Sequence, residues 1–233
     1  MLEELLRAGL DELGLRPDET ALRRFRQYYH YLTEQNRVMN LTAISGEEDV
    51  ARLHFLDCAA LLGFVPLNGG RVIDVGSGAG FPGMVLKILR PELDMTLLDS
   101  LDKRVRFLAQ LGELLELEDL RCLHRRAEEP GELRAQFDTA VSRAVARLDL
   151  LAELCLPYVK KGGLLVAMKG PAAAEELEQA QRAIRLLGGA TEACAEYAVP
   201  GTELRHCAVL IRKTDDTPAK YPRRWAQMKK QPL

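Results

Sequence analysis

The sequence predicts an α/β protein with a doubly wound, mainly parallel sheet and an N-terminal helical extension. From Arg71 onward, short apolar runs alternate with segments of helical periodicity, beginning with "RVIDVG", "PGMVLKILR" and "MTLLDS". Strands that alternate with helices form βαβ units and hence a parallel sheet. A glycine-rich turn directly follows the first run, as in cofactor-binding sheets. The last two runs, "EACAEYAVP" and "HCAVLIRK", have no helix between them, so one strand should pair antiparallel with its neighbour.

Residues 1–66 are expected to form helices that pack on this sheet. In "PDETALRRFRQYYHYLTEQNRVM" the apolar residues recur at spacings of three and four: Leu22, Phe25, Tyr29 and Leu32. That spacing places them on one helix face. Pro66 and the following Asn-Gly-Gly turn mark a boundary. We therefore expect a core at 67–213 and a basic tail at 214–233.

The composition indicates a soluble globular protein of the cytoplasm. Of the 233 residues, 47% are hydrophobic, which is sufficient for a full core. No apolar run approaches the roughly 20 residues of a membrane span. The start, "MLEELLRAGLDELGL", is acidic and lacks a small-residue cleavage site, so no signal peptide is expected. The five cysteines are widely spaced without a C-x-x-C pair, which argues against a disulfide framework and against a metal site.

The net charge of −2 conceals a basic C-terminus. From Arg212 to the end there are seven basic residues and two acidic ones, so this part carries +5 and the remainder −7. A basic segment suits a polyanion such as nucleic acid. The alternative is a solvated tail that only aids solubility.

The turn "VIDVGSGAGFPG", residues 72–83, indicates a ligand that approaches the backbone closely. Its glycines satisfy the G-x-G-x-x-G pattern of dinucleotide folds: Gly78, Gly80 and Gly83. A pyrophosphate needs free N–H donors, but Pro82 removes one donor and Asp74 adds a negative charge. A Walker loop is excluded because no Gly-Lys-Ser/Thr follows the glycines.

S-adenosylmethionine fits this turn better, because it has no phosphate and carries cations that a carboxylate such as Asp74 favours. Asp99 closes the second strand about 20 residues beyond the glycines, the usual distance for a carboxylate that accepts from ribose hydroxyls. Ala127 and Glu128 follow the third strand, where the adenine edge would lie. The order of these signals favours a methyltransferase.

The fourth strand indicates the acceptor. It reads "FDTAVSRAVA" and lacks both the Asn/Asp-Pro-Pro-aromatic segment of amine methyltransferases and a Pro-Cys nucleophile. Cys155 lies in an apolar helical pattern and is expected in the core. A purine ring nitrogen has a free lone pair and needs no general base. Alignment of the two reactants would then suffice.

Basic residues follow four successive strands: Lys103, Arg126, Arg143 and Lys169. Because these strand ends share one edge of the sheet, we expect the four side chains to rim one crevice. A basic rim suggests a phosphate-bearing acceptor. For each residue alone, a surface ion pair is the alternative.

Eight strings occur in order between Asn36 and Arg224: "NLTAI", "HFLD", "DVGSGAGFPG", "LLDSLDKRVRFL", "RAEE", "SRAVA", "AMKGP" and "YPRR". Together they resemble the bacterial small-subunit ribosomal RNA guanine-N7 methyltransferases, the RsmG family, once called glucose-inhibited division protein B. The resemblance implies a class I, Rossmann-like methyltransferase that uses S-adenosyl-L-methionine. It implies methylation of N7 of one guanine of 16S rRNA in the small ribosomal subunit or its assembly intermediate.

The resemblance also implies site residues. With the turn residues, the expected cofactor contacts are Asp74, Gly76, Gly78, Gly80, Phe81, Asp99, Ser100, Ala127, Glu128 and Arg143. Asn40 and Lys169 would position the guanine, although Asn40 suits a helix-end cap equally well. The expected RNA contacts are Lys103, Arg126, Arg223 and Arg224. His54 is expected to be a buried, hydrogen-bonded residue, and the protein is expected to be a monomer.

Three alternatives remain open at this point. One is a methyltransferase for another RNA position or a small metabolite. The second is a noncatalytic RNA-binding protein that uses S-adenosylmethionine only as a structural or sensing ligand. The third is an NAD dehydrogenase, which preferential binding of a nicotinamide dinucleotide would support.

Overall fold

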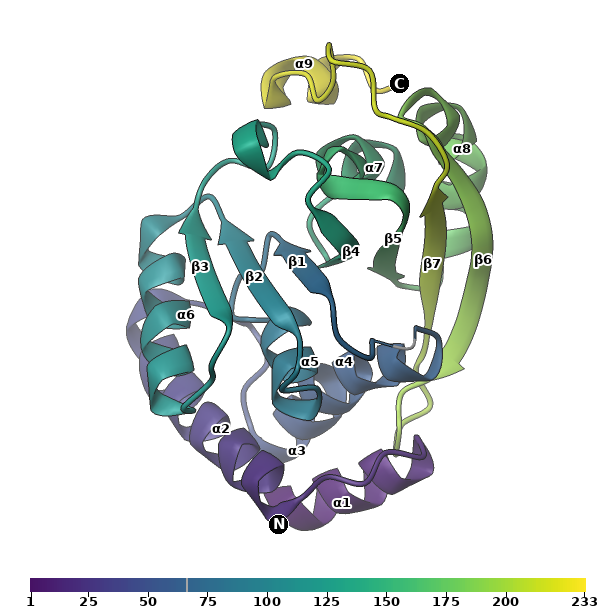
Figure 1. Ribbon diagram of the computed structural model, residues 1–233. Coiled ribbons are helices and arrows are strands. Elements are labelled where there is room, and N and C mark those ends of the chain that lie inside the picture. Colours follow the sequence, from purple (N-terminus) through teal and green to yellow (C-terminus); the bar gives the residue numbers. More distant parts are fainter. Residues whose placement is uncertain (66) are drawn as a thin grey trace.

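The computed structural model describes residues 1–65 and 67–233, which form a seven-stranded sheet between two helical layers (Figure 1). The strands follow the spatial order β3-β2-β1-β4-β5-β7-β6. They are β1 (Arg71–Val75), β2 (Asp94–Asp99), β3 (Leu120–His124), β4 (Phe137–Arg143), β5 (Val159–Lys169), β6 (Gly189–Ala198) and β7 (Arg205–Lys213). The first five strands are parallel, and β7 runs antiparallel to both β5 and β6. The predicted fold class and the antiparallel final strand are confirmed.

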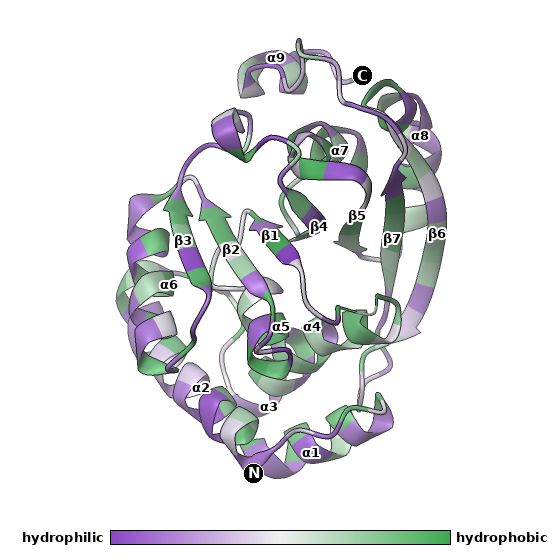
Figure 2. Ribbon diagram, viewed as in Figure 1, coloured by the Kyte–Doolittle hydropathy of each residue, from purple (hydrophilic) through white to green (hydrophobic). Residues whose placement is uncertain are grey.

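The helices divide between the two faces of the sheet. They are α1 (Leu2–Glu12), α2 (Glu19–Met39), α3 (Glu47–Val50), α4 (Asp57–Ala59), α5 (Gly83–Leu89), α6 (Asp102–Leu114), α7 (Leu148–Cys155), α8 (Ala173–Leu186) and α9 (Trp225–Lys230). A π-helical turn, Ala51–Leu56, joins α3 to α4, and 3-10 turns cover Ala60–Gly63, Gly131–Leu133 and Leu156–Tyr158. In Figure 2, α1, α2 and α6 carry both hydrophobic and hydrophilic residues, as amphipathic helices that cover a core do.

The alternation of strand side chains produces two hydrophobic cores. In β5, Leu164 and Val166 lie in the core beneath α5 and α6, whereas Leu165 and Ala167 lie in the core beneath α7 and α8. Successive strand residues point to opposite faces of a sheet, and here both faces are covered. Cys155 is fully buried in the second core, so the prediction of a packing role is confirmed.

The N-terminal helices share a core with the sheet. Asp18 caps α2 by accepting a hydrogen bond from the Ala21 N–H at 2.7 Å. The buried Tyr28 hydroxyl donates to the carbonyl of Ala79 in the glycine loop at 2.6 Å. The helical extension therefore supports the loop directly. The predicted domain boundary at Pro66 lies outside the described residues.

The C-terminal segment folds back onto the protein. Figure 1 shows α9 at the end of the sheet toward which β1, β2 and β3 point. Met228 and Tyr221 of this segment are buried in the second core. Within residues 1–65 and 67–233, none of the helices combines the length and the apolar character needed to cross a membrane.

Candidate active site

The glycine loop after β1 depends on backbone conformations that favour glycine. Gly76, Gly78 and Gly80 have φ angles of 76°, 59° and 103°, in the left-handed region. A Cβ at Gly76 would lie 2.5 Å from the Val145 Cγ2 atom. A Cβ at Gly80 would lie 2.5 Å from the Tyr28 hydroxyl. Gly80 thus permits close packing against α2.

Asp74 lies beneath this loop. It is fully buried, and its Oδ2 accepts a hydrogen bond from the Gly83 N–H at 2.8 Å. Its Oδ1 has no hydrogen-bond partner among the described residues. Burial raises the pKa of this carboxyl to about 7. The side chain fixes the turn from below.

A cleft of about 480 Å³ opens above the loop, and we call it the glycine-loop cleft. It is lined by most of the predicted cofactor residues: Gly76, Gly78, Phe81, Asp99, Ser100, Ala127, Glu128 and Arg143. Asp74 and Gly80 are absent from its lining among the described residues. Both residues support the loop in this structure, and their direct contact with the cofactor stays a prediction. The motif could not show this, because it does not reveal which loop residues face the sheet.

Asp99 connects the loop to the second strand. Its Oδ2 accepts from the Gly78 N–H at 2.9 Å, and its Oδ1 accepts from the Leu101 N–H at 2.9 Å. Each carboxylate oxygen has a further lone pair. Asp99 can therefore hold the loop and still accept hydrogen bonds from a diol in the cleft.

The far end of the glycine-loop cleft lies beyond β3. Ala127 and Glu128 line it, and the Tyr158 hydroxyl donates to the Ala127 carbonyl at 2.9 Å. Arg126 also lines the cleft, with its Nη1 3.8 Å from a Glu128 carboxylate oxygen. Trp225 from the C-terminal segment also lines the cleft. No motif in the sequence indicated Trp225, because its position depends on how the tail folds back.

A second cleft, of about 660 Å³, lies beside the first, and we call it the Lys169 cleft. The two clefts share four lining residues: His54, Arg143, Ala144 and Val145. The Lys169 ammonium donates to the Ala146 carbonyl at 2.6 Å and to a Glu176 carboxylate oxygen at 2.7 Å. Its side chain is only 8% exposed. Lys169 therefore forms part of the wall of this cleft, and its charge is paired with that of Glu176.

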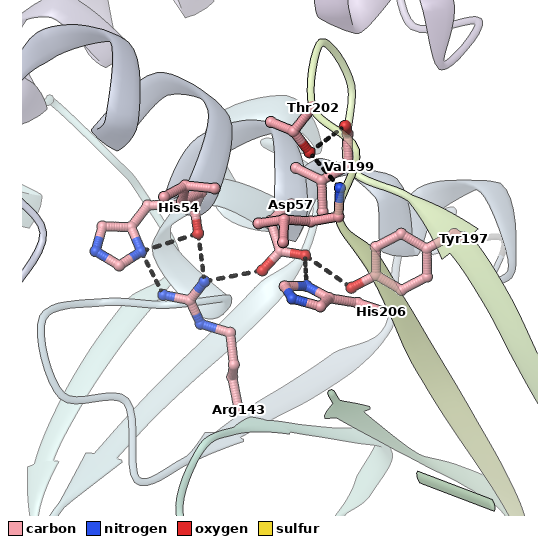
Figure 3. A network of polar contacts seen from close by, with 9 residues as sticks. His54, Asp57, Arg143, Tyr197, Val199, Thr202 and His206 are labelled. Atoms are coloured by element: carbon pink, nitrogen blue, oxygen red, sulfur yellow. Dashed lines mark hydrogen bonds and ion pairs between the residues drawn. The ribbon is translucent and has the colours of Figure 1, made fainter. Parts of the chain in front are cut away.

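Arg143 lines both clefts and so forms part of the wall between them. Figure 3 shows its polar contacts. Its Nη1 donates to Asp57 Oδ2 at 3.0 Å and to the Leu53 carbonyl at 3.1 Å. Its Nη2 lies 2.8 Å from His54 Nδ1. The guanidinium carbon is 4.9 Å from the centre of the Phe81 ring, a distance that permits a cation–π interaction.

His54 is neutral in this arrangement. Because arginine can only donate, His54 Nδ1 accepts from Arg143, and Nε2 carries the proton toward the Thr42 hydroxyl 2.9 Å away. Burial, together with the Arg143 charge, lowers the pKa of His54 to about 3. Its ring stacks on Phe81 with 4.2 Å between centroids. The prediction of a buried, hydrogen-bonded His54 is confirmed.

Asp57 is the centre of the network in Figure 3. Its Oδ1 accepts from the Tyr197 hydroxyl at 2.9 Å and from His206 Nδ1 at 2.8 Å. The hydrogen bond to Asp57 raises the pKa of His206. Asp57 closes the "HFLD" string, but neither Asp57 nor His206 carried a predicted role. Their partners are distant along the chain, so spacing gave no signal.

The predicted basic rim is corrected. Arg126 and Arg143 line the glycine-loop cleft, and Arg143 and Lys169 line the Lys169 cleft. Lys103 lines neither, and its exposed ammonium is 3.4 Å from the Met39 carbonyl. The strand ends do share one edge of the sheet. However, the charges of Arg143 and Lys169 are neutralised by ion pairs with Asp57 and Glu176 in the cleft walls.

The other residues predicted to face the RNA, Asn40, Arg223 and Arg224, differ from one another in their hydrogen bonds and exposure. Asn40 ends α2 in the left-handed conformation, with φ of 50°, and its backbone N–H donates to the Asn36 carbonyl, which is the cap role. Arg223 forms an ion pair with the buried Glu153 at 2.6 Å, which anchors the tail, and its contact with RNA stays a prediction. Arg224 is exposed.

Comparison with known proteins agrees with this geometry. Residues 21–203 match the model of the GidB family, rRNA small subunit methyltransferase G. The chain is 42% identical over 234 residues to ribosomal RNA small subunit methyltransferase G of Clostridium tetani, covering 99% of this chain and 98% of the relative. It is 44% identical over 233 residues to the protein of the same name from Alkaliphilus metalliredigens, covering 98% of each.

Solved structures share the fold. A ribosomal protein L11 methylase from Lactobacillus delbrueckii has a TM-score of 0.52 at 13% identity, covering 68% of this chain and 78% of the other. The precorrin-6y C5,15-methyltransferase of Geobacter metallireducens has a TM-score of 0.51 at 15% identity, covering 67% of this chain and 87% of the other. The chain therefore belongs to the GidB family, rRNA small subunit methyltransferase G, and is an S-adenosylmethionine-dependent methyltransferase.

Proposed function

We propose that the protein methylates N7 of a guanine in 16S rRNA, with the cofactor in the glycine-loop cleft and the guanine in the Lys169 cleft. The observation that carries this assignment is the wall shared by the two clefts, which includes His54 and Arg143. A donor in one cleft and an acceptor in the other would meet at this wall. Holding two reactants at near-attack distance is the main requirement of methyl transfer.

The residues suit a transfer without a general base. When bound, S-adenosylmethionine would supply an activated methyl group for the lone pair of guanine N7, with its sulfur as the leaving group. Guanine N7 carries no proton, so no side chain has to remove one. Arg143, fixed by Asp57 and His54, positions the two reactants. Because its pKa is lowered, His54 is neutral and adds no positive charge beside the sulfonium of the cofactor.

The cofactor contacts follow from the lining of the glycine-loop cleft. Asp99 would accept from the ribose hydroxyls, while Ala127 and Glu128 would contact the adenine edge. On the substrate side, Lys169 forms part of the wall around the base, and Asn40 remains a candidate for RNA contact. Lys103, Arg126 and Arg224 would contact RNA phosphates. The protein would act as a cytoplasmic monomer on the small subunit or its assembly intermediate.

Methyl transfer to undermethylated RNA tests the proposal. The protein is incubated with radiolabelled S-adenosylmethionine and either naked 16S rRNA or small-subunit particles, followed by nucleoside analysis. We expect labelled 7-methylguanosine from at least one of the two substrates. A different labelled nucleoside would refute the N7 assignment. Cofactor binding without any labelled RNA would instead support a noncatalytic RNA-binding protein.

A further inference from the structure

We propose that Trp225 is a cofactor-binding residue, and that the C-terminal segment thereby forms one wall of the cofactor site. Trp225 lines the glycine-loop cleft, as Ala127 and Glu128 do. It comes from a segment whose charge alone indicated contact with nucleic acid. The segment therefore has a second role, which its composition does not reveal.

A buried ion pair fixes the backbone just before Trp225. Arg223 Nε lies 2.8 Å from Glu153 Oε1, and Arg223 Nη2 lies 2.6 Å from Glu153 Oε2. The Arg223 backbone N–H also donates to Glu153 Oε1 at 2.8 Å. Glu153 is fully buried on α7. A two-pronged arginine–carboxylate pair imposes a defined geometry, so the entry of the chain into α9 is set by the core.

A second group of contacts holds the segment on both sides of Trp225. Arg134 donates to the carbonyl oxygens of Thr217 and Tyr221. Met228 is fully buried, three residues after Trp225. Residues three apart lie on one face of a helix, so Trp225 and Met228 share the inner face of α9. The indole position is thus determined by packing on either side of it.

The chemistry of the indole suits the adenosine end of the cofactor. It presents a flat, largely apolar surface, and purines stack well on such surfaces. Trp225 is half-buried, so a part of it remains free to contact a ligand. Leu154, also in the lining, supplies further apolar surface. An aromatic wall in a cleft that Glu128 also lines could contact a purine face while the carboxylate contacts its edge.

The outer face of the same segment keeps its charge. Arg224, Lys229 and Lys230 are exposed, whereas Trp225 and Met228 face inward. One short helix therefore presents cations to the surroundings and an indole to the cofactor cleft.

Fluorescence provides a direct test, because Trp225 is the only tryptophan of the chain. The full-length protein is titrated with S-adenosylhomocysteine, with adenosine and with methionine. We expect a saturable change in tryptophan emission with the first two ligands and none with methionine. An unchanged emission at saturating S-adenosylhomocysteine, with binding verified by calorimetry, would overturn the proposal.

Calorimetry on variants provides the second test. Loss of one stacked aromatic costs about tenfold in affinity, so Trp225→Ala should bind S-adenosylhomocysteine about tenfold more weakly. Trp225→Phe should stay within about threefold of wild type because it keeps an aromatic face. Lys230→Ala is the matched control and should bind normally, because Lys230 is exposed and lies five residues after Trp225, away from its helix face. Wild-type affinity of a folded Trp225→Ala would overturn the proposal, even if emission changes. Neither test depends on which nucleotide is methylated.

Discussion

The guanidinium of Arg143 lies 3.0 Å from the carboxylate of Asp57, although the two residues are 86 positions apart. Asp57 belongs to the N-terminal helices and Arg143 ends β4. Tyr197 and His206 bring β6 and β7 to the same carboxylate. One buried carboxylate thus joins three parts of the chain at the wall between the two clefts.

Replacing Arg143 should affect both stability and activity. In Arg143→Ala the buried Asp57 carboxylate loses its opposite charge, so we expect the free energy of unfolding to fall by about 3 kcal/mol. Methylation should be lost as well. Arg143→Lys keeps the charge but lacks the planar fork, and should lose activity with a smaller loss of stability. Urea unfolding and methyl incorporation measure the two effects. An unchanged unfolding midpoint in Arg143→Ala would contradict the buried pair.

His54 should make stability depend on pH. Its pKa is lowered to about 3 in the folded protein, against about 6.5 in an unfolded chain. Between these values the unfolded chain binds more protons, so stability rises with pH and is lost on acidification below about 6.5. This group alone gives a slope of about 1.4 kcal/mol per pH unit.

The variant His54→Gln isolates this contribution. A glutamine amide can still accept from Arg143 and donate to Thr42, but it does not titrate. Chemical unfolding at pH 7, 6 and 5 should show a steeper loss of stability in the wild type than in the variant. His206 titrates in both proteins and cancels in the comparison. Parallel pH profiles would show that His54 does not titrate as proposed.

Asp99 should be required for cofactor affinity. Asp99→Ala removes the acceptors for the Gly78 and Leu101 N–H groups and the proposed ribose acceptor. Hydrogen bonds to charged groups contribute about 1.5–3 kcal/mol each, so S-adenosylhomocysteine should bind at least about tenfold more weakly. Asp102→Ala is the matched control, because Asp102 is exposed and pairs with Arg106. Calorimetric affinity within twofold of wild type for Asp99→Ala would exclude its role.

The sequence was sufficient to predict the fold and to predict most of the residues that line the glycine-loop cleft. Short apolar runs, helical spacing and the glycine turn are local patterns, and they indicated the sheet and the glycine-loop cleft. Asp99, Ala127 and Glu128 line that cleft as expected. Their positions at strand ends follow from topology alone, because parallel strands end at one edge.

Other features depend on contacts between distant residues. Lys169 is the last residue of its strand, close to its predicted place, yet its charge is paired with Glu176 from the next helix. Arg223 and Arg224 are adjacent basic residues with the same expected role, and only the fold distinguishes them. Trp225 had no motif. In each case the determining partner lies on another element, so spacing along the chain contains no information about it.

Arg223 and Arg224 offer a matched pair for testing the tail, because each alanine variant removes one positive charge from neighbouring positions. Arg224 is exposed, so Arg224→Ala should weaken RNA binding and reduce the slope of log affinity against log salt by about 1, with normal stability. Arg223→Ala should leave the fully buried Glu153 unpaired and lower the free energy of unfolding by about 3–5 kcal/mol. Filter binding over a salt series and urea unfolding separate the two effects. If Arg223→Ala were as stable as the wild type and showed the reduced salt slope expected for Arg224→Ala, Arg223 would be the RNA contact and not the anchor of the tail.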